Sequence, residues 1–349
     1  MDPTTALHNF SQTDIIYPMT TPGLADNGYE FSEESKMALA ITISVVTILG
    51  LFGNAMVILI VLIFSDMHTL INFCFANLAL TDLTLLLLDA VPTATDTIGW
   101  NLSAKLGCNI PIYLQYVVAE VTSLTLAFLS WDRYRLIVNP LKSLSTRSSK
   151  TIYLIMFLIW IASFVVQIPV AFVPGATPET SCAEFGQPWG QELFFSYATF
   201  SLYIVPLIVI VPCYTKIAIN MSAFTASEVN DEASRRRVAQ RKRTIIGIFV
   251  VVIFYILMWL PVHVVHMWMA FHPVVTASTP LYIELHTAAN VLIFVNSSVN
   301  PYLYTLAGSS FRRHVSDIGH FCLCGFIRRE KTKSTTSSSR EATGSTMMQ

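Results

Sequence analysis

This sequence contains few charged residues. Only 12% of its 349 residues are Asp, Glu, Lys or Arg, whereas a typical soluble domain carries about 25%. Hydrophobic residues make up 53% of the chain. A chain of this length has too few charges to cover the surface of a soluble protein, so its composition indicates a membrane protein.

The sequence also lacks the alternating pattern of a membrane β-barrel. Its apolar residues form seven runs instead, each long enough to cross about 30 Å of hydrocarbon as a helix of about 20 residues. The runs lie near residues 37–64, 72–97, 107–138, 150–173, 193–221, 240–271 and 281–306. Because helices satisfy their own backbone hydrogen bonds in lipid, we predict an all-α membrane protein with a bundle of seven transmembrane helices.

Four regions are predicted along the chain. Residues 1–36 form an extracellular tail, 37–306 the bundle, 307–324 a short amphipathic eighth helix and 325–349 a disordered cytosolic tail. The eighth helix is predicted from an apolar face that would lie on the membrane, formed by Phe311, Val315, Ile318 and Cys322. No basic segment followed by an apolar run precedes the first span, so we expect no cleaved signal peptide.

Positive charge is nearly absent from one side of the predicted membrane. Of the 21 lysine and arginine residues, only Lys36 and Lys105 lie on the side of the N-terminus. The positive-inside rule therefore predicts a plasma-membrane protein with an extracellular N-terminus and a cytosolic C-terminus.

Acidic residues gather on the predicted outer side, and their negative field would attract a cationic partner. A solvated acidic surface explains those in the N-terminal tail, but it explains Asp89 and Glu284 poorly because both lie at helix depth. The outer acidic residues are Asp2, Asp14, Asp26, Glu30, Glu33, Glu34, Asp89, Asp96, Glu179, Glu184, Glu192 and Glu284.

Cysteine is scarce as well, with six residues. Cys108 and Cys182 lie on the outer side, where an oxidising environment allows a disulfide. Cys322 and Cys324 follow the last span at the cytosolic face, where palmitoylation would anchor the chain. A free thiol is the alternative in each case. Asn9, in an Asn-Phe-Ser sequon on the outer side, is a candidate glycosylation site.

Three carboxyl groups lie inside the predicted spans. Because a charged residue is costly there, each is a candidate functional residue. Asp82 is near the middle of the second span, and Asp89 follows two turns later on the same face. Glu120 is deep in the third span, where we expect a structural, hydrogen-bonded carboxyl. In the same span, Gln115 and Arg133 are separated by a whole number of helical turns, so one polar face runs from the outer mouth to the cytosolic edge. Thr122 lies between them on this face.

The sixth and seventh spans each contain a proline, which kinks a helix. In the sixth, Trp259, His263 and His266 share one face beside Pro261. One interpretation is a ligand-sensing lever; histidines packed in the core or at the lipid edge are an equal alternative. In the seventh, Pro301 follows the polar residues Asn296, Ser297 and Asn300.

In order and spacing, these features resemble the rhodopsin-like (class A) G-protein-coupled receptors. The motifs that carry the resemblance are Asn54, Asp82, Cys108 with Cys182, "DRY" at 132–134, Trp160, Pro206 with Tyr214, "WLP" at 259–261 and "NPYLY" at 300–304. The resemblance covers the whole helical core.

The resemblance implies an activation switch and a sodium site. Asp132 would hold Arg133 at rest, and Tyr214 and Tyr304 would turn in beneath the released arginine. The other residues implied for the switch are Tyr134, Trp259, Pro261, Asn300 and Pro301. The implied sodium ligands are Asp82, Thr122, Asn296 and Ser297; no other cofactor is expected. Three residues depart from the usual pattern of the family: Ser123, Tyr255 and Met258.

Two residues that this sequence lacks exclude two classes of ligand. The family's monoamine receptors have an aspartate where this chain has Gln115, and opsins need a lysine that residues 281–306 lack. The remaining resemblance is to the galanin, kisspeptin and allatostatin-A receptors. The stretches "INFCFANLALTDLT", "YLQ", "SCAE" and "GSSFR" are most similar to kisspeptin receptors, whereas "HVVHMW" and "NSSVNP" are similar to galanin receptors.

The expected function is that of a receptor for an amidated, cationic, kisspeptin-like neuropeptide, which activates heterotrimeric G proteins through phospholipase C and calcium. The alternative is a galanin- or allatostatin-like receptor that inhibits adenylyl cyclase. The expected ligand contacts are Asp89, Gln115, Glu184, His263, His266 and Glu284.

Further partners and rival functions follow from the rest of the chain. The basic segment 234–243 would bind anionic lipids or shape the G-protein contact, and the Ser/Thr-rich tail would be phosphorylated by receptor kinases and bind arrestin. We expect no nucleic-acid partner. A lipid or small-molecule receptor is a weaker reading. A transporter is disfavoured by the absence of paired repeats, and no constellation of catalytic residues indicates an enzyme.

Overall fold

The computed structural model describes residues 31–107, 109–138, 149–172, 191–227, 232–272, 280–307 and 311–318. All regular secondary structure in these ranges is helical. Six helical segments within them are long and apolar enough to cross a membrane. They are Glu33–Ile63, Leu70–Thr97, Asn109–Val138, Thr151–Phe172, Glu192–Asn220 and Lys242–Phe271.

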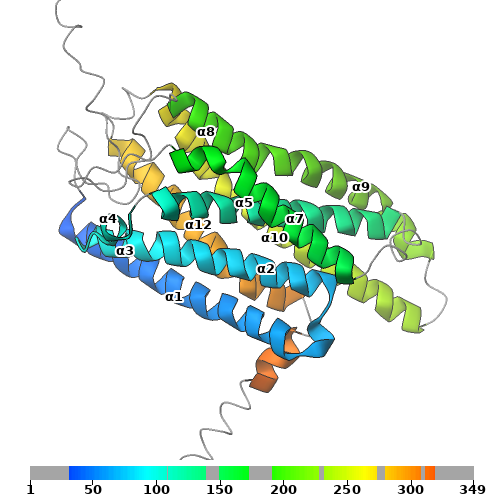
Figure 1. Ribbon diagram of the computed structural model, residues 1–349. Coiled ribbons are helices and arrows are strands. Elements are labelled where there is room, and N and C mark those ends of the chain that lie inside the picture. The colour runs from blue at the N-terminus through cyan, green and yellow to red at the C-terminus, as the bar shows by residue number, and fades with distance from the viewer. Residues whose placement is uncertain are drawn as a thin grey trace, which may run out of the picture. The chain divides into compact units, whose positions relative to one another are not determined.

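The seventh segment is α12 (Pro280–Ala307), which is long enough but more polar. Its polar side chains face inward: Asn296, Ser297, Ser298 and Asn300 are each at most 4% exposed. Burial inside the bundle thus explains why a spanning helix can carry so many polar groups. The prediction of a seven-helix membrane bundle is confirmed, and its helices run side by side in Figure 1.

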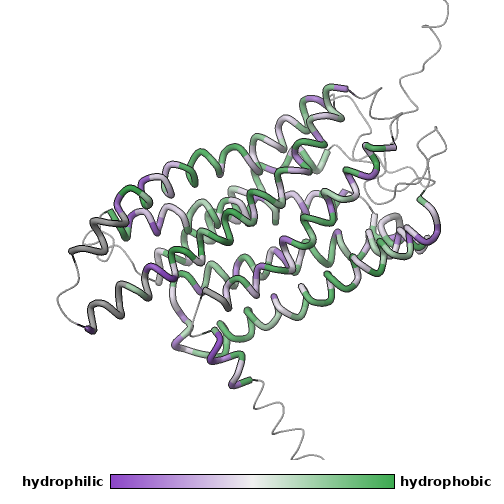
Figure 2. Tube along the Cα trace, turned by 180° about the vertical axis from the view of Figure 1, so that it is seen from behind, coloured by the Kyte–Doolittle hydropathy of each residue, from purple (hydrophilic) through white to green (hydrophobic). Residues whose placement is uncertain are grey.

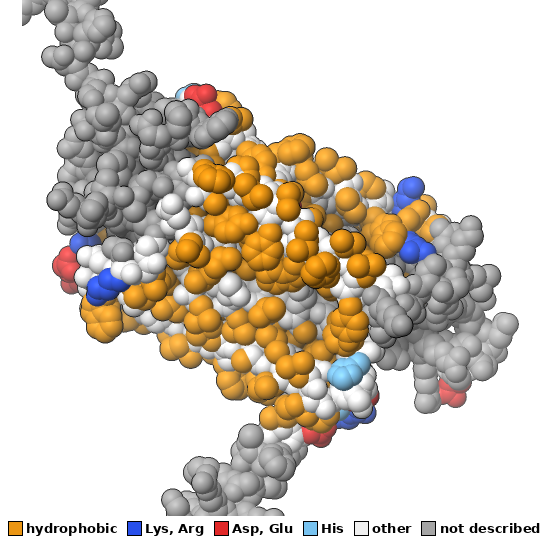
Figure 3. Space-filling view, viewed as in Figure 1, with side chains coloured by type: hydrophobic (Ala, Val, Ile, Leu, Met, Phe, Trp, Pro, Cys, Tyr) orange, Lys and Arg blue, Asp and Glu red, His pale blue; other side chains and the backbone are white. Residues whose placement is uncertain are grey.

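The surface of the bundle is apolar where it would meet lipid. Ile48 and Phe52 of α1 (Glu33–Ile63) are 65% and 67% exposed. Hydrophobic segments run along the middle of the helices (Figure 2), and hydrophobic side chains cover much of the visible face of the bundle (Figure 3). The charged side chains visible in Figure 3 lie toward the helix ends.

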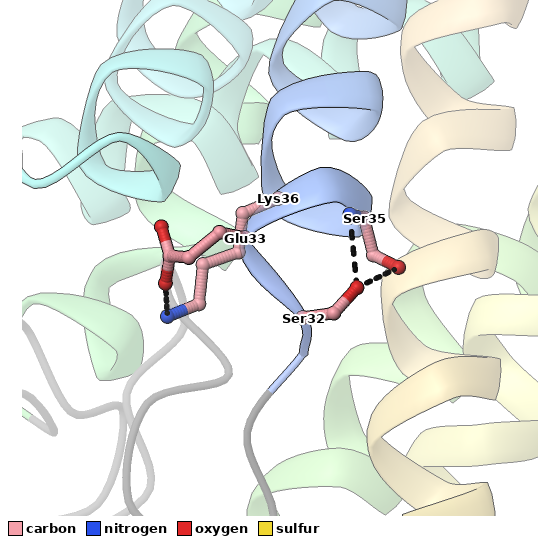
Figure 4. A network of polar contacts seen from close by, with 4 residues as sticks. All are labelled: Ser32, Glu33, Ser35 and Lys36. Atoms are coloured by element: carbon pink, nitrogen blue, oxygen red, sulfur yellow. Dashed lines mark hydrogen bonds and ion pairs between the residues drawn. The ribbon is translucent and has the colours of Figure 1, made fainter.

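The first helix begins before the apolar run that predicted it, because polar residues cap it. Ser32 accepts a hydrogen bond from the backbone N–H of Ser35 at 3.2 Å, and Lys36 pairs with Glu33 at 2.9 Å (Figure 4). Glu33 and Glu34 also lie in the first turn, where negative charge favours the helix dipole.

Two spans contain a π-helical turn. The second runs through α2 (Leu70–Leu85), η3 (Leu86–Ala90) and α3 (Val91–Thr97); the fifth runs through α8 (Gln191–Thr199), η5 (Phe200–Ile204) and α9 (Val205–Ser227). Such wide turns are rare and frequent at functional sites. Neither was predicted from the sequence.

The other described elements complete the bundle. The central helix, α5 (Asn109–Val138), is buried along most of its length. The fourth span is α7 (Ser149–Val166) with η4 (Ile168–Phe172), and the sixth is α10 (Glu232–Phe271). Two short helices are η2 (Ser65–Met67) and α4 (Leu102–Leu106). Residues 311–318 form a separate helix within the predicted 307–324.

Glycine allows α1 to approach α12 closely. A Cβ on Gly50 would lie 2.3 Å from Ser298 Oγ and 2.6 Å from Leu86 Cδ1. These separations are far below van der Waals contact, so a larger side chain at Gly50 would push the helices apart.

Candidate ligand cavity and activation switch

A cavity opens between the helices near Asp89; it encloses about 530 Å³ of empty space, which includes open solvent at its mouth. We call this end of the bundle, where α1 begins, the Asp89 end, and the opposite end the Arg133 end. The walls are mainly apolar and come from five spans. The lining residues are Leu85, Asp89, Gln115, Tyr116, Ala119, Ala198, Leu202, Trp259, Val262, His263, His266, Asn290 and Ile293.

The structure brings four of the six predicted ligand contacts to this cavity: Asp89, Gln115, His263 and His266. Glu284 is exposed and does not line it. Glu184 lies outside the described residues. The register of three helices therefore gathers groups that are distant in sequence.

Asp89 lies on the π-helical turn η3. Thr93 Oγ1 donates to its Oδ1 at 3.5 Å, and Gln115 Nε2 donates to the neighbouring Leu88 carbonyl at 2.8 Å. Within the part of the chain that the structure describes, no lysine or arginine forms an ion pair with Asp89. A carboxyl group in such an apolar cavity is suited to a cationic or hydrogen-donating group of a ligand.

The two predicted histidines present nitrogen atoms for hydrogen bonding. His263 Nδ1 lies 3.2 Å from Thr199 Oγ1, and the His266 ring stacks on Phe195 at 4.4 Å. The Nε2 atoms of both histidines are buried and have no partner among the described residues. Both residues are among those that line the cavity, so a bound ligand can satisfy these atoms.

Sequence reasoning missed two residues of α12 at this site. The His286 ring lies 5.6 Å from the His266 ring and its Nδ1 is 3.5 Å from Asn290 Nδ2. Asn290 itself lines the cavity. The spacing of His286 and Asn290, one turn apart, was the available signal, but it does not show which helix they face.

Trp259 connects the cavity to a polar cluster deeper in the bundle. Its Nε1 donates to Asn296 Oδ1 at 3.3 Å. Beyond Asn296, Asp82 accepts a hydrogen bond from Asn300 Nδ2 at 2.9 Å and another from the Ser297 side chain. Cavity and cluster are thus joined by one indole group.

The cluster offers oxygen atoms of the kind that hard cations prefer. The Asp82 carboxyl is 2% exposed, and within the described ranges it has no lysine or arginine partner. The hydroxyls of Thr122 and Thr81 lie 2.8 Å apart nearby in the bundle. Asn296 Nδ2 and Asn300 Oδ1 have no described partner, so the cluster is not satisfied by protein atoms alone. The oxygen atoms of Asp82 and Asn300 are of the kind that fit a small cation, and sodium binding by the four residues stays a prediction.

The Arg133 end of the bundle is closed. Asp132 and Arg133 are both buried and form a hydrogen-bonded ion pair. Ile137 of α5, Ile217 of α9 and Ile245 of α10 pack together here, and Tyr134, Val138 and Tyr214 pack against them. Tyr304 stacks on Phe75 at 4.2 Å. This arrangement leaves α10 in contact with α5 and α9.

Comparison with known proteins agrees with this geometry. The family model described as "7 transmembrane receptor (rhodopsin family)" matches residues 53–304. The chain therefore belongs to the rhodopsin family of seven-transmembrane receptors. It is a multi-pass protein of the plasma membrane and a signalling receptor, not an enzyme.

Several receptors are similar over most of their length. The chain is 30% identical over 284 residues to "G-protein coupled receptor 54" of Oreochromis niloticus, covering 77% of this chain and 75% of that one. It is 30% identical over 282 residues to the "KiSS-1 receptor" of Homo sapiens, covering 76% and 70%. It is 26% identical over 340 residues to the "Mesotocin receptor" of Rhinella marina, covering 91% and 86%. The predicted resemblance to kisspeptin receptors is thereby supported.

Proposed function

We propose that this protein is a cell-surface receptor for an extracellular neuropeptide and that it activates heterotrimeric G proteins. The observation that carries the proposal is the cavity, which Asp89, His263 and His266 line together with Trp259 and in which the two histidines have unpaired nitrogen atoms. Similarity to receptors named for KiSS-1, mesotocin and bombesin supports a peptide as the ligand.

The Asp89 end faces outward in this proposal, because lysine and arginine are almost absent from it. A cationic, amidated, kisspeptin-like peptide suits the site. Its positive group would pair with Asp89, and its terminal amide would donate to an imidazole nitrogen. Exposed Glu284, and Glu184 outside the described residues, would add to the attraction of a cation at the outer surface.

Ligand binding would shift the bundle between two states. The ligand acts on Trp259, which is bonded to Asn296 of α12 and lies next to the hinge at Pro261. When α10 swings about this hinge, the isoleucine cluster opens and Arg133 leaves Asp132 to meet the G protein. The residues that would hold sodium in the closed state are Asp82, Thr122, Asn296 and Ser297.

Signalling through phospholipase C and calcium is proposed from the kisspeptin resemblance. The galanin- or allatostatin-like alternative would lower cyclic AMP instead. Receptor kinases, arrestin and anionic lipids are proposed as further partners. The predicted glycan on Asn9, disulfide between Cys108 and Cys182, and palmitoylation of Cys322 and Cys324 lie outside the described residues and remain predictions.

A combined calcium and cyclic AMP assay tests the proposal. Cells expressing the receptor are challenged with amidated kisspeptin-like, galanin-like and allatostatin-like peptides and with the non-amidated kisspeptin-like form. Cells expressing Arg133→Ala at the same surface level serve as the matched control. The proposal predicts a calcium rise to the amidated kisspeptin-like peptide that this control lacks. A fall in cyclic AMP to another peptide would move the ligand and the coupling to the alternative, and silence at confirmed surface expression would contradict a peptide ligand.

A further inference from the structure

Two tyrosines join the fifth span to the sixth by reciprocal hydrogen bonds. The Tyr203 hydroxyl of η5 donates to the Ile256 carbonyl of α10 at 3.0 Å. The Tyr255 hydroxyl of α10 donates to the Leu202 carbonyl of η5, also at 3.0 Å. Each tyrosine therefore bonds to the backbone of the span that carries the other, and we call these two bonds the tyrosine clasp.

The clasp is buried, so water does not compete with it. Tyr255 is 2% exposed and Tyr203 is 6% exposed. The Tyr255 ring lies 5.5 Å from that of Trp259. In an apolar surrounding an unpaired hydroxyl is costly, which favours the state in which both bonds are made.

Both acceptor carbonyls lie where the helices are irregular. Leu202 is inside the π-helical turn η5. Ile256 is in the turn that precedes Pro261, whose missing N–H leaves the Leu257 carbonyl without its usual helical donor. The clasp thus bridges the irregular segment of one span and the hinge of the other.

The clasp also lies between the two functional regions. Leu202 and Trp259 line the cavity on one side of it. On the other side, Ile245 of the same helix α10 packs in the closed isoleucine cluster. A swing of α10 that opens the cluster has to change the distance between α10 and η5.

We propose that Tyr203 and Tyr255 are positioning residues that hold α10 in the closed state and thereby set the basal activity of the receptor. A ligand that displaces Leu202 or Trp259 strains both bonds and releases the helix. This inference rests on the proposed function as a G-protein switch, but not on the identity of the peptide.

Removal of single hydroxyls tests the clasp without peptide. Tyr203→Phe and Tyr255→Phe keep each ring and remove one hydrogen bond. Each variant should raise basal G-protein signalling per surface receptor roughly two- to ten-fold, and the double variant should raise it further. Tyr113→Phe is the matched control, because Tyr113 donates to the Phe164 carbonyl at 2.8 Å and joins α5 to α7 rather than to α10. Its basal signalling should equal that of the wild type.

A distance probe between the Arg133 ends of α5 and α10 in the purified receptor supplies a readout that a purely structural role would not move. The clasp variants should show a larger open population than both the wild type and Tyr113→Phe. Unchanged distances and unchanged basal signalling in Tyr203→Phe would overturn the proposal, whether or not Tyr255→Phe reaches the surface. A normal peptide response with an unchanged basal level would refute the clasp alone. Open clasp variants of a receptor that answers no peptide would support the clasp while contradicting the peptide proposal.

Discussion

Asn300 of α12 donates a hydrogen bond to Asp82 of α2 at 2.9 Å, and the two residues stand far apart in the sequence. Both side chains are at most 3% exposed. The bond places a carboxyl group at the centre of the bundle, between the ligand cavity and the closed Arg133 end. The charge of the Asp82 carboxyl group should therefore influence both the ligand cavity and the Arg133 end.

Sodium sensitivity should depend on Asp82. In the wild type, replacing choline chloride with sodium chloride should weaken agonist binding, because the ion favours the closed state. Asp82→Asn removes the negative charge, so agonist affinity should no longer change with the cation. Radioligand binding at constant ionic strength measures this. A sodium effect of wild-type size in Asp82→Asn would show that the ion acts elsewhere.

Neutralising Asp89 should impair recognition of a cationic peptide. Asp89→Asn keeps the size of the side chain but removes the partner of a buried positive group, so potency should fall about 30-fold or more. Glu284→Gln is the matched control on the exposed surface, where a charge contributes about 1 kcal/mol or less and the loss should be only a few-fold. Concentration–response curves of the calcium signal measure the peptide potency of both variants. Full potency of Asp89→Asn would remove Asp89 from the ligand site.

Enlarging Gly50 should destabilise the receptor. Gly50→Val places a Cβ atom where the side chains of Ser298 and Leu86 already lie, and overpacking of this kind costs about 1–3 kcal/mol. Surface expression and thermal stability in detergent should both fall. Ile48→Val, on the 65% exposed face of α1, should leave both unchanged. Equal stability of the two variants would contradict the close helix contact.

Asp96 should stabilise the loop after the second span. Its carboxyl group is 5% exposed and accepts hydrogen bonds from the backbone N–H groups of Leu102 and Ser103. Asp96→Ala should therefore lower stability by about 0.5–2 kcal/mol, as loss of a helix cap does. Lys105→Ala is the control, because Lys105 lies in α4, the short helix that contains Leu102 and Ser103. A thermal-stability assay in which Asp96→Ala matches the wild type would remove this structural role.

The sequence was sufficient to predict the seven spans, because long apolar runs have few alternatives in lipid. It also predicted Asp89, Gln115, His263 and His266 as ligand contacts, because polar residues within a span are expected to face the interior of the bundle. The structure now places all four around one cavity, although their roles as contacts remain predictions.

What could not be predicted depends on how the helices are rotated against one another. The tilted ring contact between His286 and His266 and the clasp formed by Tyr203 and Tyr255 join different spans. Both π-helical turns change that rotation, and no short motif marks them. Asp96 was grouped with the outer acidic residues; that its carboxyl group also accepts hydrogen bonds from the backbone could not be predicted from the sequence.

The most direct test of the central claim is nucleotide exchange by a purified phospholipase-C-coupled G protein, measured with the reconstituted receptor. We predict that an amidated peptide ending in arginine and an aromatic residue accelerates exchange and that its non-amidated form does so far less. If no peptide accelerates exchange by this G protein or by one that inhibits adenylyl cyclase, while the receptor is shown to be folded, the account of a peptide-driven switch is contradicted.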